Sequence, residues 1–315
     1  MNTEKVTYDI KLDKSDQPKG TIDFERLAFL ADKISKIAKG ALQIRIGGIS
    51  HKKGKTVKHL DKALQIRLTG IEAGSTILNC ETQSFANTLP GIQIDAFRPE
   101  VALELPKQTP MSLFMMAFTE AFDDTDEEKP FLDKPLIKDL IDLKSFFKND
   151  NEELIISNNN VTPTITLRKK DFSKIKQLEE SYPEPQNIVV NGKIDVLQHS
   201  KSKVTINTEE GTINGILKDA SLNAEIKQYW GTEATVYGLG HYKPNGRLNY
   251  IEIERIYQST PEDKYFSKIP FAETTEQQIQ KQTSSKSNKN WMREIAGKWP
   301  NDVSDEEFDK LLNNL

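Results

Sequence analysis

The chain has 315 residues, of which 36% are hydrophobic and 29% are charged. Its net charge of −4 comes from 43 basic and 47 acidic residues, and this near balance excludes a whole-chain attraction to nucleic acid or anionic membranes. The single cysteine, Cys80, excludes an intramolecular disulfide and a cysteine-rich metal cluster. Residues 1–12 carry no apolar signal-type run, and no stretch approaches the ~20 apolar residues of a membrane helix. We therefore expect a cytoplasmic protein of two or three modest domains joined by exposed segments.

The pattern over residues 1–180 predicts an α+β domain of mixed helices and hairpins. The expected elements are a strand at 6–12, a helix from Thr21 or Asp23 to between Gly40 and Gly48, strands at 63–68 and 76–82, helices at 111–122 and 136–147, and short strands at 154–156 and 164–167. The Met and Phe side chains of 111–122 could form an adaptable binding surface. Because such side chains spread around a helix more often form a core, we favour a buried core here.

Residues 186–258 predict a second domain, a small β-barrel, after a joint at Pro183 and Pro185. The expected order is strands at 188–196, 203–208 and 212–217, a helix at 221–230, and strands at 233–241 and 247–255. Glu210-Gly211 and Asn245-Gly246 predict hairpin turns, and Asn-Gly is the stronger signal of the two. This order of elements resembles the OB-fold, a five-stranded barrel. An SH3-like barrel and an unrelated small β-barrel are the alternatives.

Residues 259–290 predict a flexible, disordered tether. The segment is rich in Ser, Thr, Gln, Lys and Glu, and such a segment cannot bury enough apolar area to repay its ordering entropy.

Residues 291–315 predict a partner-binding tail that ends in a short amphipathic helix. Ser304 and Glu307 have the spacing of a capping box, and Val303 and Phe308 that of a hydrophobic staple. The apolar positions i, i+3, i+4 and i+7 are filled by Phe308, Leu311, Leu312 and Leu315. A helix this short is marginal alone, so it needs a surface, either on its own first domain or on an outside partner. We favour the outside partner, because helix-in-groove recognition uses this spacing.

The tail also resembles the tails of antitoxin-like bacterial proteins, which are often encoded beside PIN-domain ribonuclease toxins. The resemblance rests on the AGKWPND run at 296–302, followed by the DEEF run at 305–308 and by Leu311. Asn301 stands where that pattern has Gly, and Val303 where it has Glu. The resemblance implies a tail that wraps and blocks a nuclease, with a basic side chain in the toxin's acidic metal-binding site. The expected contact residues are Trp291, Arg293, Lys298, Trp299, Phe308, Leu311, Leu312 and Leu315.

Arg293 and Lys298 are the tail's candidates for the basic side chain. The alternative is that both are ordinary solvated charges.

Nucleic-acid binding by the barrel is the alternative function. Its candidate residues are Tyr237, Tyr242 and Tyr250 for base stacking, with Lys243 and Arg247 nearby. Residues 187–258 hold eight basic and eight acidic residues, which argues against a strongly cationic surface. The basic run at 51–59 could contact phosphate, but we favour a solvated loop.

The sequence predicts no metal site, no cofactor and no catalytic residue. The four histidines lack the spacing of a zinc set, and Cys80 is expected to be a small core residue. We therefore expect a non-catalytic protein-binding module of the antitoxin or immunity-protein type. An enzyme that uses carboxylates which the pattern does not single out is the least favoured alternative.

Overall fold

The computed structural model describes residues 5–51, 58–72, 76–89, 99–123, 125, 129–158, 162–198, 203–219 and 221–284. The chain divides into two compact units, residues 1–272 and 273–315. The first unit contains an α+β domain and a closed β-barrel, as predicted.

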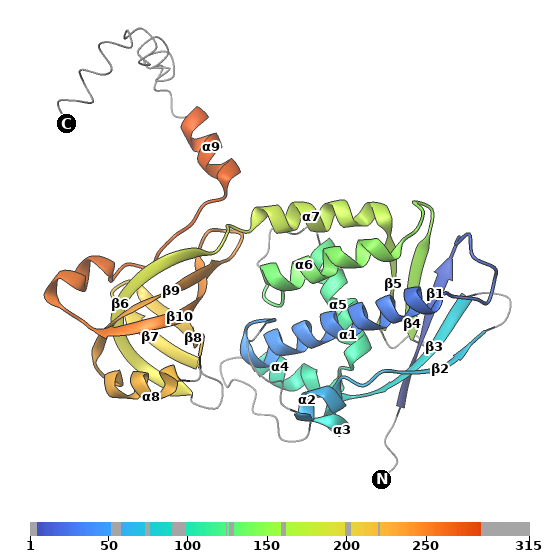
Figure 1. Cartoon of the computed structure of the whole chain (residues 1–315), viewed down its shortest axis with the longest axis horizontal. Helices are drawn as coiled ribbons and strands as arrows, with labels where there is room; N and C mark the ends of the chain where they lie inside the picture. Colours follow the sequence, from blue (N-terminus) through green and yellow to red (C-terminus); the bar gives the residue numbers. More distant parts are fainter. Residues whose placement is uncertain are drawn as a thin grey trace, which may run out of the picture. The chain divides into compact units, whose positions relative to one another are not determined.

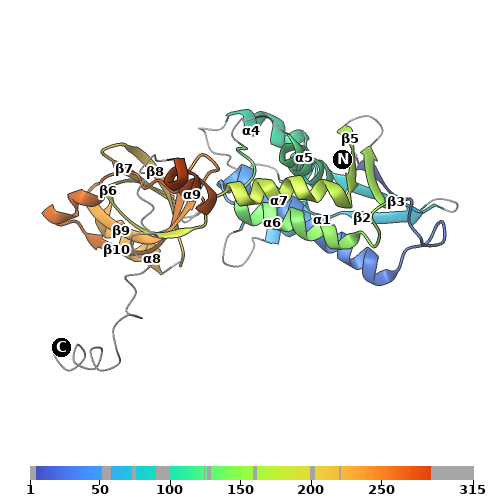
Figure 2. The same cartoon turned by 90° about the horizontal axis from the view of Figure 1, so that it is seen from above.

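The α+β domain is a five-stranded antiparallel sheet with helices on one face. Its elements are β1 (Lys5–Asp13), α1 (Phe24–Gly47), α2 (Lys58–Ala63), β2 (Arg67–Ile71), β3 (Thr76–Gln83), α3 (Phe85–Thr88), α4 (Pro99–Glu104), α5 (Pro110–Phe122), α6 (Lys134–Asp142), β4 (Glu153–Asn158), β5 (Thr162–Arg168) and α7 (Phe172–Ser181). Short 3-10 turns lie at Leu105–Lys107, Leu143–Phe146 and Lys169–Asp171. The strand order is β2-β3-β1-β4-β5. Figures 1 and 2 show α1, α5, α6 and α7 gathered on the same side of this sheet.

Strand alternation sets which face of the sheet the helices cover. On β1, Tyr8, Ile10 and Leu12 are buried, whereas Asp9 and Lys11 between them are partly exposed. Successive side chains of a strand point to opposite faces, so the alternation predicted for residues 6–12 is confirmed.

Helix α1 supplies the longest apolar stripe over that face. Leu30, Ile34, Ile37 and Ala41 recur at three- and four-residue spacing and are buried. The helix ends at Gly48, which has a φ of 83° and donates its N–H to the Ile44 carbonyl. A left-handed residue of this kind favours glycine, which explains the end of the helix.

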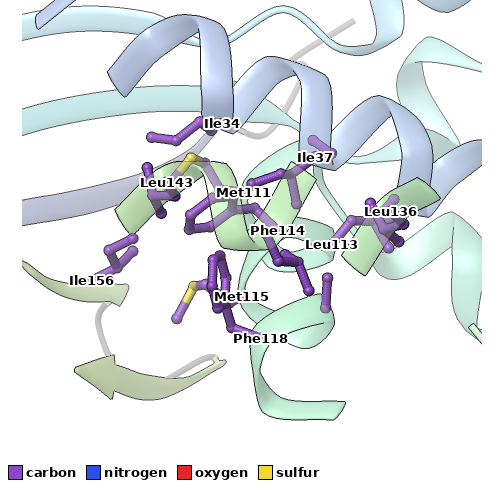
Figure 3. Close-up of a cluster of buried hydrophobic side chains, with 14 of the residues drawn as sticks. Ile34, Ile37, Met111, Leu113, Phe114, Met115, Phe118, Leu136, Leu143 and Ile156 are labelled. Atoms are coloured by element: carbon purple, nitrogen blue, oxygen red, sulfur yellow. The ribbon is translucent and has the colours of Figure 1, made fainter. Parts of the chain in front are cut away.

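Helix α5 fills the middle of the core, as predicted for the Met- and Phe-rich segment. Met111, Phe114, Met115 and Phe118 are buried, and Figure 3 shows them among side chains of α1, α6 and β4. The Phe114 and Phe118 rings lie 5.1 Å apart between centroids. Met116 is only partly buried, however, so one side of α5 reaches the surface.

The second domain is an OB-like barrel that begins at Gln186, where the sequence predicts it. Its elements are β6 (Gln186–Gln198), β7 (Lys203–Thr208), β8 (Gly211–Leu217), α8 (Leu222–Ile226), β9 (Glu233–Tyr242) and β10 (Leu248–Gln258). The strands close in the order β6-β7-β8-β10-β9, with β9 paired back onto β6. β8 and β10 run parallel, and the other neighbours are antiparallel. This Greek-key closure, with a helix between the third and fourth strands, is that of the OB-fold.

A short segment closes each end of the barrel: helix α8 closes one end, and residues 269–272, which lie beyond the predicted boundary at residue 258, close the other. Ile226 of α8 is buried at the end where β8 finishes. Because β8 and β10 run parallel, the turns that precede them share the opposite end. There the N–H of Ile269 donates to Glu210, and the N–H of Ala272 donates to the Gly246 carbonyl.

The structure therefore differs from the tether predicted at 259–290. Residues 259–272 are part of the barrel, with a 3-10 turn at Pro261–Phe266 and a buried Ala272. Helix α9 (Thr275–Ser284) follows. Its start has a capping box, because Thr274 and Gln277 each accept a backbone N–H from the other. The remainder of the predicted tether, 285–290, lies outside the described residues.

Candidate functional site

The predicted partner-binding residues of the tail lie outside the described residues. They are Trp291, Arg293, Lys298, Trp299, Phe308, Leu311, Leu312 and Leu315. The described chain ends in α9, whose apolar residue Ile279 is 54% exposed.

Two of the three tyrosines predicted to stack bases are buried, which corrects that interpretation. Tyr242 is 5% exposed and belongs to the barrel core. Its hydroxyl lies 3.1 Å from the position that a Cβ would take at Gly240, so a side chain there would crowd the ring. Burial raises the pKa of Tyr242. A base cannot stack on a ring enclosed in this way.

Tyr250 is on the outer surface of β10 but is only 7% exposed. Its ring stacks on that of His241, with 4.4 Å between centroids, and it clusters with Ile49 and Ile216. Burial raises the pKa of the Tyr250 hydroxyl. Strand alternation places a side chain outside a barrel, but it does not reveal that a neighbouring segment covers it.

Tyr237 remains the accessible ring of the three. It is partly buried on β9, beside Val189 of β6 in the strand register. The Arg255 guanidinium lies 5.9 Å from its ring centroid, and contact with Tyr257 raises the Arg255 pKa. Tyr257 is half exposed, so this arginine lies between two aromatic side chains.

Lys243 and Arg247 are brought together by the β9–β10 turn. The N–H of Lys243 donates to the Arg247 carbonyl, and the N–H of Gly246 donates to the Lys243 carbonyl. Gly246 has a φ of 79°, a conformation that the predicted Asn-Gly turn requires. The structure adds Phe271, which pairs with Arg247 in an isolated β-bridge and is 60% exposed.

Sequence reasoning missed Phe271 because it lies in the segment predicted to be a tether. The signal was the apolar run from Ile269 to Ala272, which stands in a mostly polar stretch. In OB-folds the turn between the fourth and fifth strands takes part in ligand binding. Phe271, Arg247 and Lys243 place an aromatic ring and two cations at this turn of the barrel.

Ser50, His51 and Asp139 have the residue types of a nucleophilic triad but not its geometry. The Ser50 hydroxyl lies 3.1 Å from His51 Nδ1, and His51 Nε2 lies 3.5 Å from Asp139. The hydroxyl, however, donates to Asp133 over 2.6 Å, and Ser50 is 1% exposed. Asp133 caps α6 by accepting the N–H of Leu136. We interpret the group as a clamp between the end of α1 and the start of α6.

No family model matches this chain, and neither a curated protein nor a solved structure matches it. Within the described ranges, no three His, Cys, Asp or Glu side chains could hold a metal ion together. The same ranges contain no helix with the length and apolarity to span a bilayer. Cys80 is buried in the sheet core, as predicted, and burial raises its pKa to about 11.

Proposed function

We propose that this chain is a non-catalytic binding protein that neutralises a ribonuclease partner with residues 291–315. The proposal follows the resemblance of the tail to antitoxin-like proteins, and such a protein would act in the cytoplasm beside its nuclease. The observation that supports this proposal is the position of the last buried apolar residue of the described chain, Ala272.

The described parts of both cores are built from residues that precede the C-terminal unit. Every buried apolar side chain of the described chain lies between Tyr8 and Ala272. The compact unit ends at this point, and Ile279 beyond it is exposed. Because the described cores draw on no residue after Ala272, we infer that the apolar side chains of the tail bury their surface against a partner.

The energies are sufficient for a specific complex. Burying one large apolar side chain gains about 1.5–3 kcal/mol, so Trp299, Phe308, Leu311 and Leu312 would together gain roughly 6–12 kcal/mol. Folding a disordered segment on binding costs about 2–5 kcal/mol. The capping box and the staple lower that cost, because they favour the helix before it binds.

Nuclease inhibition tests this proposal. The partner to try first is a PIN-type ribonuclease encoded in a neighbouring reading frame, assayed on a labelled RNA. Phe308→Ala and Leu311→Ala should each raise the concentration needed for inhibition at least tenfold. The control Ile279→Ala, in α9, should change nothing. Inhibition that survives the tail variants would exclude the tail as the inhibitory segment.

Single-stranded nucleic acid is the second candidate ligand, and the β9–β10 turn favours it. Phe271 supplies an exposed ring beside Arg247, and base–aromatic stacking together with a nearby cation is how OB-folds hold single strands. The balanced charge of residues 187–258 predicts weak, salt-sensitive binding.

A further inference from the structure

A cavity of about 680 Å³ lies between the end of α1, the C-terminal half of α5 and the edge strand β5. Met116, Phe122 and Ile165 supply much of its apolar wall, and Met115 contributes a buried side chain beneath them. Small-molecule sites have volumes of about 300–1,000 Å³, with apolar walls and a few polar groups. Flexible methionines let such a wall adapt to its ligand.

The polar group of interest in this cavity is Arg45, which is 3% exposed. Its Nη1 donates to the Ala41 carbonyl over 3.1 Å, and its guanidinium lies 4.3 Å from the Phe131 ring centroid. Its Nη2 is buried without a hydrogen-bond partner, and Arg45 forms no ion pair with any residue that the structure describes. Burial lowers the Arg45 pKa to about 10, so the group stays charged at neutral pH.

An unpaired buried guanidinium is costly, because buried charges are normally paired and hydrogen-bonded. Glu120 lines the same cavity and attracts Arg45 electrostatically, yet it forms neither a hydrogen bond nor an ion pair with it. One Glu120 oxygen instead accepts the N–H of Phe131 over 3.0 Å, and burial raises the Glu120 pKa. Asp123 lies near Lys129 and accepts hydrogen bonds from Thr125. Among the described residues, Arg45 therefore has one buried donor, Nη2, without an acceptor, and no carboxylate within ion-pair distance.

We propose that the cavity binds a small, largely apolar monocarboxylate. The ligand's carboxylate pairs with the Arg45 guanidinium, and its hydrocarbon body lies against Met116, Phe122 and Ile165. A carboxylate supplies both the acceptor and the negative charge that the guanidinium lacks. The site is in the α+β domain, so it is independent of the function proposed for the tail.

Calorimetric titration of the full chain at neutral pH with decanoate, decanol and decylammonium tests this proposal. The three probes share a hydrocarbon chain and differ in the head group. We expect decanoate to bind at least tenfold more tightly than decanol, since a hydrogen bond to a charged group contributes about 1.5–3 kcal/mol and 1.4 kcal/mol is tenfold. Decylammonium should bind most weakly. Equal affinities for decanoate and decanol would overturn the proposal.

Two variants locate the site. Arg45→Met should weaken decanoate binding at least tenfold and leave decanol binding unchanged. Met116→Trp should weaken the binding of both by placing a bulky indole against the apolar wall, and Met116 is partly exposed, so this variant should fold. The control Leu103→Trp adds the same indole on α4, at a position that is 70% exposed, and should bind normally. If Arg45→Met does not fold, the proposal is tested by the relative affinities of the wild-type chain for decanoate, decanol and decylammonium, and by the affinity of Met116→Trp for decanoate. Wild-type decanoate affinity in Arg45→Met or in Met116→Trp would overturn the assignment.

Discussion

Arg26 and Glu152 form a two-pronged ion pair in the interior of the α+β domain, although they are distant in the sequence. The N–O distances are 3.1 and 2.7 Å, and the two side chains are almost completely buried. The Lys148 N–H also donates to Glu152, and the Arg26 guanidinium stacks on Phe146. The pair joins the first turn of α1 to the segment before β4.

Removing one member of this pair should be severe. Arg26→Met leaves a buried carboxylate without its partner, and we expect the free energy of unfolding in urea to fall by about 3–5 kcal/mol. The matched control is Lys33→Met, which breaks the more exposed pair with Asp142 and should cost about 0–1 kcal/mol. A similar loss of unfolding free energy in Arg26→Met and Lys33→Met would show that burial does not make the Arg26–Glu152 pair more important for stability.

The same pair predicts a pH dependence. Burial opposes ionisation of Glu152, but hydrogen bonds from Arg26 and the Lys148 N–H outweigh it, so the Glu152 pKa lies below its ordinary value of 4.5. Its stabilisation is therefore complete above pH 4.5 and is lost as the pH falls through the folded-state pKa. The stability gap between the wild-type chain and Arg26→Met should narrow on acidification. A gap that stays constant from pH 7 to pH 3 would contradict this assignment.

Strand alternation, helical spacing and turn dipeptides in the sequence predicted those strands, helices and turns that short-range interactions determine. Alternation located β1, three- and four-residue spacing located α1, and the Asn-Gly pair located the β9–β10 turn. The element order also predicted the OB-like barrel, because a helix between the third and fourth strands constrains how five strands can close.

Long-range contacts could not be predicted in this way. No local pattern pairs Arg26 with Glu152, or places Ile49 over Tyr250. Helix α7 was missed, although Phe172, Ile175 and Leu178 have helical spacing, because short polar runs between them resemble a loop. The sequence-based set of residues at the β9–β10 turn also lacked Phe271, because this residue reaches the turn only through tertiary packing.

The barrel boundary at Ala272 predicts how truncations behave. A chain ending at Gln258 loses the segment 269–272 that closes the barrel and leaves Asn191 without its Ser259 partner, so it should lose about 2–5 kcal/mol of stability. A chain ending at Ala272 should unfold like one ending at Ser284 in calorimetry. Equal stability of the chains ending at Gln258 and at Ala272 would show that residues 259–272 contribute nothing to the stability of the barrel.

The β9–β10 turn predicts which residues bind single strands. If the barrel binds a fluorescent oligonucleotide at low salt, Phe271→Ala should weaken binding by about 1–3 kcal/mol, the scale of base stacking. Arg247→Ala should weaken it and reduce its salt dependence. The control Tyr242→Phe keeps a buried ring and should bind normally. Finding no salt-sensitive binding to any oligonucleotide would remove this candidate function.

Deleting residues 291–315 should leave the body intact, because its cores end at Ala272. We expect its melting temperature to stay within about 2 °C of that of the full chain, since 1 kcal/mol corresponds to roughly 2–4 °C for a folded body of 150–250 residues. A drop of ten degrees or more would mean that the tail packs on its own body.

Titration of the partner ribonuclease with this same truncated chain tests the central claim most directly. Inhibition of RNA cleavage is measured against the full chain at equal concentration and against the isolated peptide of residues 291–315. We predict that the truncated chain, although folded, does not inhibit at any concentration tested, and that the peptide alone restores inhibition. Full inhibition by the truncated chain would contradict the claim that the tail is the partner-binding segment.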